Sequence, residues 1–283
     1  MPRVTSSGDG PSPSSLDRAL TLLEAFRVSE DAVELRELAV RASLTKSTTH
    51  RLLSILSNHG FIESLGDGTY RLGLKVWEIG VRSGRPGSLV AFTQRHLEEL
   101  AQASQETVHL SVRDGASAVY IARIPSLQRV AAQTYLGQRV PLFCTATGKA
   151  LLAFAPNYVI DEILSQPLRR YSDLTVTDPD QLRHELEDIR QNGFSTNMGQ
   201  HHPEVGGVAA PIIGGSGEAM AAFGIAGPVY RFSPDKITTM CELVKTVARS
   251  ASLIAASGLS STRDELHPTT RESFDLNSRG VLE

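Results

Sequence analysis

The run LTKSTTHRLLSILSNHGFIESLGDGTYRLG, residues 44–73, decides the fold of the N-terminal part of the chain. Thr45 is placed to cap a helix that ends at Gly60. Two strand-like stretches, 61–64 and 69–72, then flank a Gly-Asp-Gly turn, which is typical of a β-hairpin. The apolar stripe of the helix consists of Thr49, Leu52, Leu53 and Leu56.

Two further helices are expected before this run. Apolar residues recur at helical spacing from Ser15 onward, and Ser14 with Asp17 forms the pattern of a capping box. A second short helical pattern covers 35–42, and Ser43 interrupts it. Helical spacing alone also fits a small helical bundle, but a hairpin directly after the third helix favours a winged helix-turn-helix.

The polar head of the third helix is the expected contact with DNA. In a helix-turn-helix, the N-terminal end of the second helix of the pair reaches base edges in the major groove. Arg51 suits a guanine edge or a phosphate, whereas the Lys, Ser and Thr side chains suit phosphates or mixed contacts. A simply solvated face is the alternative, and the order of the elements favours DNA. The predicted DNA-binding residues are Lys46, Ser47, Thr48, His50 and Arg51 on the helix, with Tyr70 and Arg71 on the wing.

Composition limits the classes of protein to which the chain can belong. A net charge of -3 over 283 residues argues against a protein that coats nucleic acid through a broad positive surface, although basic residues gather within 36–51. The two cysteines, Cys144 and Cys241, lack disulfide or zinc-ligand spacing and are expected to be buried. Neither an apolar run long enough for a membrane span nor a signal peptide is found, so we expect a cytoplasmic protein.

The remainder of the chain predicts a second, larger domain of the α+β class. Two hairpins are expected, one from 107–112 and 118–124, the other from 205–213 and 219–226 around a glycine-rich turn. Asp178 with Pro179 starts a helix that Gly193 ends, and Ser233 with Pro234 starts a long final one. Hairpins joined through helices predict an antiparallel sheet with helices packed on it.

The expected domain boundaries follow the changes in composition. They are a disordered tail over 1–13, the winged helix over 14–82, a hinge over 83–87, the α+β domain over 88–258 and a disordered tail over 259–283.

The chain resembles the IclR family of bacterial transcriptional regulators over roughly Ser14 to Gly258. The resemblance rests on SSLDRALTLLEAF, LTKSTTHRLLSILSNHGFIES and GTYRLGLKVWEIG in the first half, and on QETVHLSVRDGASAVYIARI, GQRVPLFCTATGKALLAF, DPDQLRHELEDIRQNGFS and GGVAAPIIGGSGEAMAAFGIAGP in the second. It implies a homodimer or homotetramer that binds operator DNA as repressor or activator. It also implies a GAF-like domain that binds a small, often carboxylate-bearing effector, with no other cofactor.

The start of the helix ATGKALLAF is the first candidate for an effector site. The backbone N–H groups of Ala146 and Thr147 can hold a carboxylate at the positive end of this helix, as their family counterparts do. An ordinary helix cap formed by Thr145 explains the same residues equally well.

Other pocket positions carried over from the family are Asn197, Gly207, Gly224 and Ala226. Many members have an acidic residue, a cysteine and two serines at these positions. Their absence leaves fewer polar partners and more room, which predicts an aromatic or otherwise bulky organic acid.

His201 and His202 are expected to lie in a loop over the pocket, where His201 can bind the effector. Adjacent histidines rarely share a metal, so no metal site is predicted. An enzyme with Cys144 as nucleophile and His201 or His109 as base is a second hypothesis, disfavoured because no nucleophile motif surrounds Cys144. A DNA-binding architectural protein without a ligand is a third hypothesis, and the size of the second domain argues against it.

Overall fold

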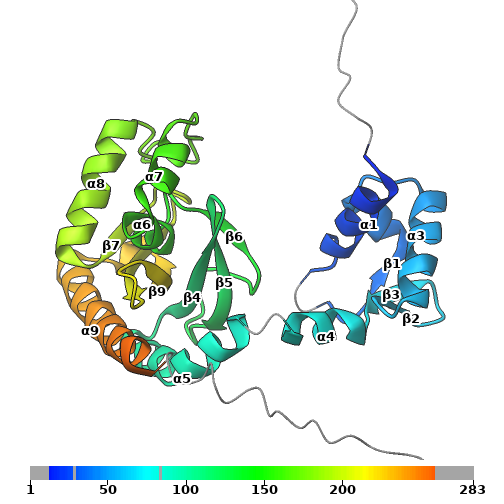
Figure 1. Cartoon of the computed structure of the whole chain (residues 1–283), viewed down its shortest axis with the longest axis horizontal. Helices are drawn as coiled ribbons and strands as arrows, with labels where there is room; N and C mark the ends of the chain where they lie inside the picture. The colour runs from blue at the N-terminus through cyan, green and yellow to red at the C-terminus, as the bar shows by residue number, and fades with distance from the viewer. Residues whose placement is uncertain (1–12, 28–29, 83–84, 259–283) are drawn as a thin grey trace, which may run out of the picture. The chain divides into compact units, whose positions relative to one another are not determined.

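The computed structural model describes residues 13–27, 30–82 and 85–258, in two compact units that divide after Phe92 (Figure 1). The tails predicted over 1–13 and 259–283 lie outside these residues, except for Pro13. Of the predicted hinge over 83–87, Ser83 and Gly84 also lie outside them. The other three residues are helical: they are the first residues of helix α5 (Arg85–Ser104), whose first turn tolerates Pro86.

The N-terminal unit is a winged helix-turn-helix, as predicted. The capping box forms, with Asp17 N donating to Ser14 Oγ at 3.1 Å and Ser14 N donating to Asp17 Oδ2 at 2.8 Å. A short strand that was not predicted joins the hairpin and gives the order β1-β3-β2. The elements are α1 (Ser15–Glu24), β1 (Val33–Glu34), α2 (Leu35–Arg41), α3 (Lys46–Asn58), β2 (Ile62–Ser64), β3 (Thr69–Leu72) and α4 (Leu74–Arg82).

The C-terminal unit is built on an antiparallel sheet, which confirms the α+β class. Within the described residues, six strands follow the order β6-β5-β4-β9-β8-β7. Both predicted hairpins are present as β4–β5 and β8–β9, whereas the edge strands β6 and β7 were not predicted. The strands are β4 (Thr107–Asp114), β5 (Ser117–Ile124), β6 (Arg139–Pro141), β7 (Ser195–Met198), β8 (Val205–Ile213) and β9 (Ala219–Pro228).

Helices cover both faces of the central strands. Every residue from Gly206 to Ile212 of β8 is buried, and successive residues of a strand point to opposite faces. Helices α6 (Ala146–Ala153) and α9 (Pro234–Gly258) both pack against β8 and β9, and α6 also packs against α8 (Pro179–Asn192) (Figure 1). Helix α7 (Asn157–Leu164) follows α6. None of the described helices is both long and apolar enough to cross a membrane.

Helix α8 starts and ends at the local signals that the sequence predicts. Asp178 Oδ1 accepts a hydrogen bond from Gln181 N at 2.7 Å, and Gly193 adopts a left-handed conformation with φ of 77°. A side chain is strained in that conformation, so glycine suits the end of the helix.

Candidate functional site

The predicted DNA-contacting residues of α3 lie on its exposed face. Lys46, Ser47, His50 and Arg51 are exposed, while Thr49, Leu52 and Leu53 are buried in the core of the unit. Thr48 is half-buried. Its backbone N–H donates a hydrogen bond to Thr45 Oγ1 at 3.3 Å, and the Thr45 hydroxyl donates one to Thr48 Oγ1 at 2.9 Å. Four polar side chains of the helix, among them those of Lys46 and Arg51, are therefore accessible to a ligand outside the unit.

The two predicted wing residues are less free than those of α3. The Arg71 guanidinium binds both carboxylate oxygens of Glu63 on the neighbouring strand, at 2.8 and 2.9 Å. Tyr70 is half-buried and packs against the core of the N-terminal unit. A phosphate contact by Arg71 thus competes with its Glu63 ion pair, and the wing residues remain predictions.

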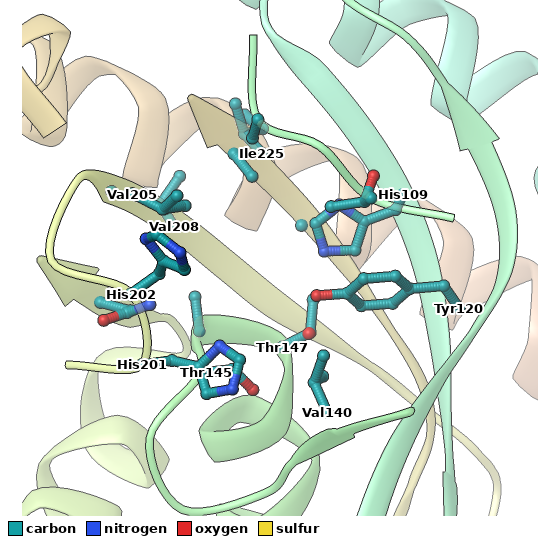
Figure 2. Close-up of a pocket in the computed structure, with 18 of the residues that line it drawn as sticks. His109, Tyr120, Val140, Thr145, Thr147, His201, His202, Val205, Val208 and Ile225 are labelled. Atoms are coloured by element: carbon teal, nitrogen blue, oxygen red, sulfur yellow. The ribbon is translucent and has the colours of Figure 1, made fainter. Parts of the chain in front are cut away.

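All seven predicted effector positions line one cavity in the C-terminal unit. Its volume is about 120 Å³, and it lies between the start of α6, strands β8 and β9, and the loop 199–204 (Figure 2). We call it the inner cavity. Of the residues the sequence proposed, it brings together Ala146, Thr147, Asn197, His201, Gly207, Gly224 and Ala226.

The start of α6 satisfies both interpretations of the sequence. Thr145 Oγ1 accepts a hydrogen bond from Gly148 N at 3.2 Å and donates one to Pro141 O at 2.8 Å, so it is a true helix cap. The cap leaves the backbone N–H groups of Ala146 and Thr147 without an acceptor among the described residues. Two donors at the positive end of a helix therefore remain for an anion in the cavity.

The cavity also carries the polar side chains of His109, Tyr120 and Thr134, which the sequence had not assigned to the effector site, beside Thr147, which it had assigned through its backbone N–H. The His109 and Tyr120 rings lie 4.2 Å apart between centroids, and Thr147 stands beside them (Figure 2). His109 Nδ1, Thr134 Oγ1 and Thr147 Oγ1 are buried and have no hydrogen-bond partner within the described part of the chain. Buried polar atoms are normally paired, so these three atoms are available to form hydrogen bonds with a ligand that enters the cavity.

Burial keeps this polar wall uncharged. It lowers the pKa of His109 to about 3, with a smaller contribution from the nearby Arg123 cation. It raises the pKa of Tyr120 to about 12, which the Thr147 hydroxyl opposes in part. His109 is therefore neutral and Tyr120 protonated near neutral pH, so both can form hydrogen bonds without adding charge.

The depressed pKa of His109 predicts a loss of stability in acid. Between pH 6.5 and about 3 the unfolded chain binds a proton at this position that the folded chain does not. Stability is therefore lost as pH falls through this window, by at most about 1.4 kcal/mol per pH unit. Urea unfolding between pH 7 and pH 5 should show this slope in the unmodified protein and a shallower one in His109→Gln. Equal slopes would contradict the assignment.

The prediction of extra room at Gly224 is wrong. A Cβ atom there would lie 2.5 Å from Thr147 Cγ2 and 2.7 Å from His109 Nε2. At Gly207 a Cβ atom would lie 3.0 Å from Ile225 O. The space that a larger residue at 224 would occupy is filled by the two neighbouring side chains, so the loss of that residue does not enlarge the cavity.

The loop 199–204 closes one side of the inner cavity and carries both histidines. Asn197 Oδ1 accepts a hydrogen bond from Gln200 N at 2.8 Å, and Thr175 Oγ1 donates to Gln200 O at 2.6 Å. The His201 ring packs 4.8 Å from that of Tyr171, and its burial lowers its pKa. Asn197 thus acts on the loop through its oxygen, and His201 faces the cavity in a largely neutral form.

Cys144 offers no support for the enzyme hypothesis. The thiol is fully buried, and burial raises its pKa to about 12, which the Lys149 cation opposes only in part. The residue does not line the inner cavity. A nucleophilic cysteine needs the thiolate form and access to substrate, and Cys144 has neither.

Comparison with known proteins is decisive for the family. The model "Bacterial transcriptional regulator IclR C-terminal" matches residues 87–253, and the model "IclR helix-turn-helix domain" matches residues 15–66. The chain belongs to the IclR family. Its relatives include the regulator KipR of Bacillus subtilis (30% identity, covering 82% of this chain and 92% of KipR) and the transcriptional repressor IclR of Escherichia coli (30%, covering 84% and 89%).

Solved structures of IclR proteins share the fold. An IclR homologue from Microbacterium hydrocarbonoxydans, complexed with 4-hydroxybenzoate, matches with a TM-score of 0.74 at 28% identity, covering 85% of this chain and 98% of that one. The Thermotoga maritima IclR matches with a TM-score of 0.69 at 28% identity, covering 84% and 97%. The chain is therefore a DNA-binding transcriptional regulator of the IclR family.

Proposed function

We propose that this regulator binds operator DNA through α3 and the wing, and that a monocarboxylic acid bound in the inner cavity controls the binding. The carboxylate accepts hydrogen bonds from the backbone N–H groups of Ala146 and Thr147. The observation that carries the proposal is the set of unpaired polar atoms on His109, Thr134 and Thr147, all of which line that same cavity. The regulated operon serves catabolism or another metabolic pathway.

The volume of the cavity supports an acid with a body the size of one ring. The inner cavity measures about 120 Å³. This is somewhat smaller than a cavity of about 150 Å³ that accepts benzene in another protein, so the inner cavity encloses at most about one ring. The 4-hydroxybenzoate bound to the Microbacterium homologue is likewise a carboxylic acid built on one ring. We therefore favour an aromatic acid over two- and three-carbon acids.

Binding titrations with the purified full chain test this proposal. Benzoate and 4-hydroxybenzoate should bind and raise the melting temperature, because a ligand that binds only the folded state stabilises it by mass action. Glyoxylate should bind more weakly. Tight binding of glyoxylate with no binding of either aromatic acid would overturn the choice of ligand. No thermal shift with any acid would favour a regulator without an effector.

We further propose a homodimer as the DNA-binding form, with a homotetramer as the alternative. Large apolar side chains are exposed on two helices of the N-terminal unit, Leu16 and Leu20 on α1 and Leu74 and Trp77 on α4. Residues three or four apart share a helix face, so each pair forms a patch suited to a second subunit. Sedimentation of the full chain and of Trp77→Glu should show association that the substitution weakens. An unchanged assembly would place the interface elsewhere.

Arg51→Ala should lower operator affinity by about 1–3 kcal/mol and relax sequence preference at one base position. The exposed guanidinium on the face of α3 is placed to make a charged or bidentate contact that alanine cannot make. Fluorescence anisotropy on a duplex selected by the unmodified protein measures the change. Arg249→Ala, an exposed arginine on α9 in the other unit, is the matched control. Equal affinities for both variants would move the recognition face away from Arg51.

A further inference from the structure

We infer that the acid bound in the inner cavity is extended by an apolar tail, which leaves that cavity and lies in a second hollow beside it. This inference rests on the proposed function, because it assumes that the carboxylate binds at the start of α6. The second hollow, which we call the outer groove, has a volume of about 610 Å³. Its lining includes Val130, Pro228, Val229 and Tyr230.

The two hollows are continuous in their lining. Ala132, Gln133, His202 and Val205 line both the inner cavity and the outer groove. The first two lie on the connection between β5 and β6, and the other two lie at the start of β8 and in the loop before it. Figure 2 shows His202 and Val205 at the edge of the inner cavity. A ligand too long for the inner cavity therefore meets the groove where it passes these residues.

The two hollows differ in chemistry, although Gln133, His202 and Glu204 add polar groups to the lining of the outer groove. The unpaired polar atoms of His109, Thr134 and Thr147 belong to residues of the inner cavity, and none of these residues lines the outer groove. The groove instead displays large apolar side chains: Val130 is 56% exposed and Tyr230 is 71% exposed. An acid with a polar head and an unbranched apolar tail matches this order, since the tail removes those side chains from water.

Hydrogen bonds hold both walls of the groove to the short helix η1 (Val229–Arg231). Arg231 Nη2 donates to Val130 O at 2.8 Å, and the same guanidinium pairs with the buried Glu106 carboxylate. On the other wall, Val229 N donates to Glu204 O at 2.8 Å. The groove is therefore formed before a ligand arrives, which lowers the entropic cost of binding a tail.

A series of linear acids tests the inference. Titration calorimetry of the full chain with butanoate, hexanoate, octanoate and decanoate should show affinity rising about fourfold for each added methylene that is buried. The rise should continue to decanoate. A plateau from hexanoate onward would overturn the inference and leave the proposed effector cavity standing. If none of these acids nor benzoate binds, both the inference and the proposed function fail.

Two matched variants show whether the tail lies in the groove. Val130→Asp places a charge on its lining, whereas Leu127→Asp places the same charge on the same connection at a side chain that is 97% exposed and lines neither hollow. Decanoate affinity should fall at least about tenfold in Val130→Asp, since a charge opposes burial of a tail. It should be unchanged in Leu127→Asp, and butanoate affinity should be equal in all three proteins. Equal decanoate affinity in both variants would overturn the inference.

Discussion

Gly224→Val is expected to abolish effector binding while operator binding by the ligand-free protein stays intact. Even the first added carbon would lie 2.5 Å from Thr147 Cγ2 and 2.7 Å from His109 Nε2. Both contacts are too short for non-bonded atoms, so the two side chains must move. They carry unpaired polar atoms of the proposed effector site, and Thr147 also supplies one of the two free backbone N–H groups. The substitution therefore changes the cavity on both sides.

Titration of each variant with benzoate measures this effect, and Gly215→Val is the matched control. Gly215 lies in the turn between β8 and β9, where an added Cβ atom has no neighbour within 4 Å. This control should bind benzoate as the unmodified protein does. Gly224→Ala limits the change to one methyl group if the valine variant does not fold. Unchanged benzoate affinity in a folded Gly224 variant would remove this part of β9 from the effector site.

The fold was predictable wherever its cause is local. Ser14, Thr45, Asp178 and Gly193 each act on a helix end within a few residues, so their sequence patterns suffice to place those ends. The short strands β1, β6 and β7 have two to four residues each and were missed. They are strands because distant segments pair with them, and so short a run contains too little alternation to be recognised.

The candidate site was predictable in its positions but not in its shape. The paired histidines suggested His201, and the family resemblance supplied the other six positions; all seven line one cavity. The resemblance could not supply His109, which comes from β4 and fills the space beside Gly224 on β9. The register of β4 with β9 places the two residues opposite one another across 115 positions of sequence. A prediction of volume from one missing side chain fails when a distant residue occupies the same space.

Lys149 is the clearest case of a role that only tertiary structure creates. A lysine in the first turns of a helix is ordinarily solvated, but Lys149 is 0% exposed. Its Nζ donates to Gln200 Oε1 at 2.6 Å and pairs with the Glu185 carboxylate on α8. Burial lowers its pKa, and Glu185 opposes that shift. The side chain thereby joins α6, the helix proposed to hold the effector carboxylate, to the loop that carries His201.

Lys149→Met should lower the free energy of unfolding of the C-terminal unit by about 3 kcal/mol and weaken benzoate binding. Removing one partner leaves the other charge partly buried without compensation, which costs about 3–5 kcal/mol in buried pairs. The lower end applies because the Glu185 side chain is 28% exposed and water screens it in part. Urea unfolding measures the loss. Lys245→Met is the matched control, since the Glu242 carboxylate with which it pairs is 61% exposed and the pair should contribute less than about 1 kcal/mol.

A second substitution separates the charge from the packing. Lys149→Met combined with Glu185→Leu removes both charges and keeps apolar volume, and such replacements are often neutral or stabilising. Stability should therefore recover in the double variant. Benzoate affinity should not, because Gln200 still lacks the bond that fixes the loop beside His201. Recovery of both properties would mean that Lys149 merely neutralises Glu185. Recovery of stability alone would mean that the loop 199–204, which Lys149 of α6 holds through Gln200, belongs to the effector site.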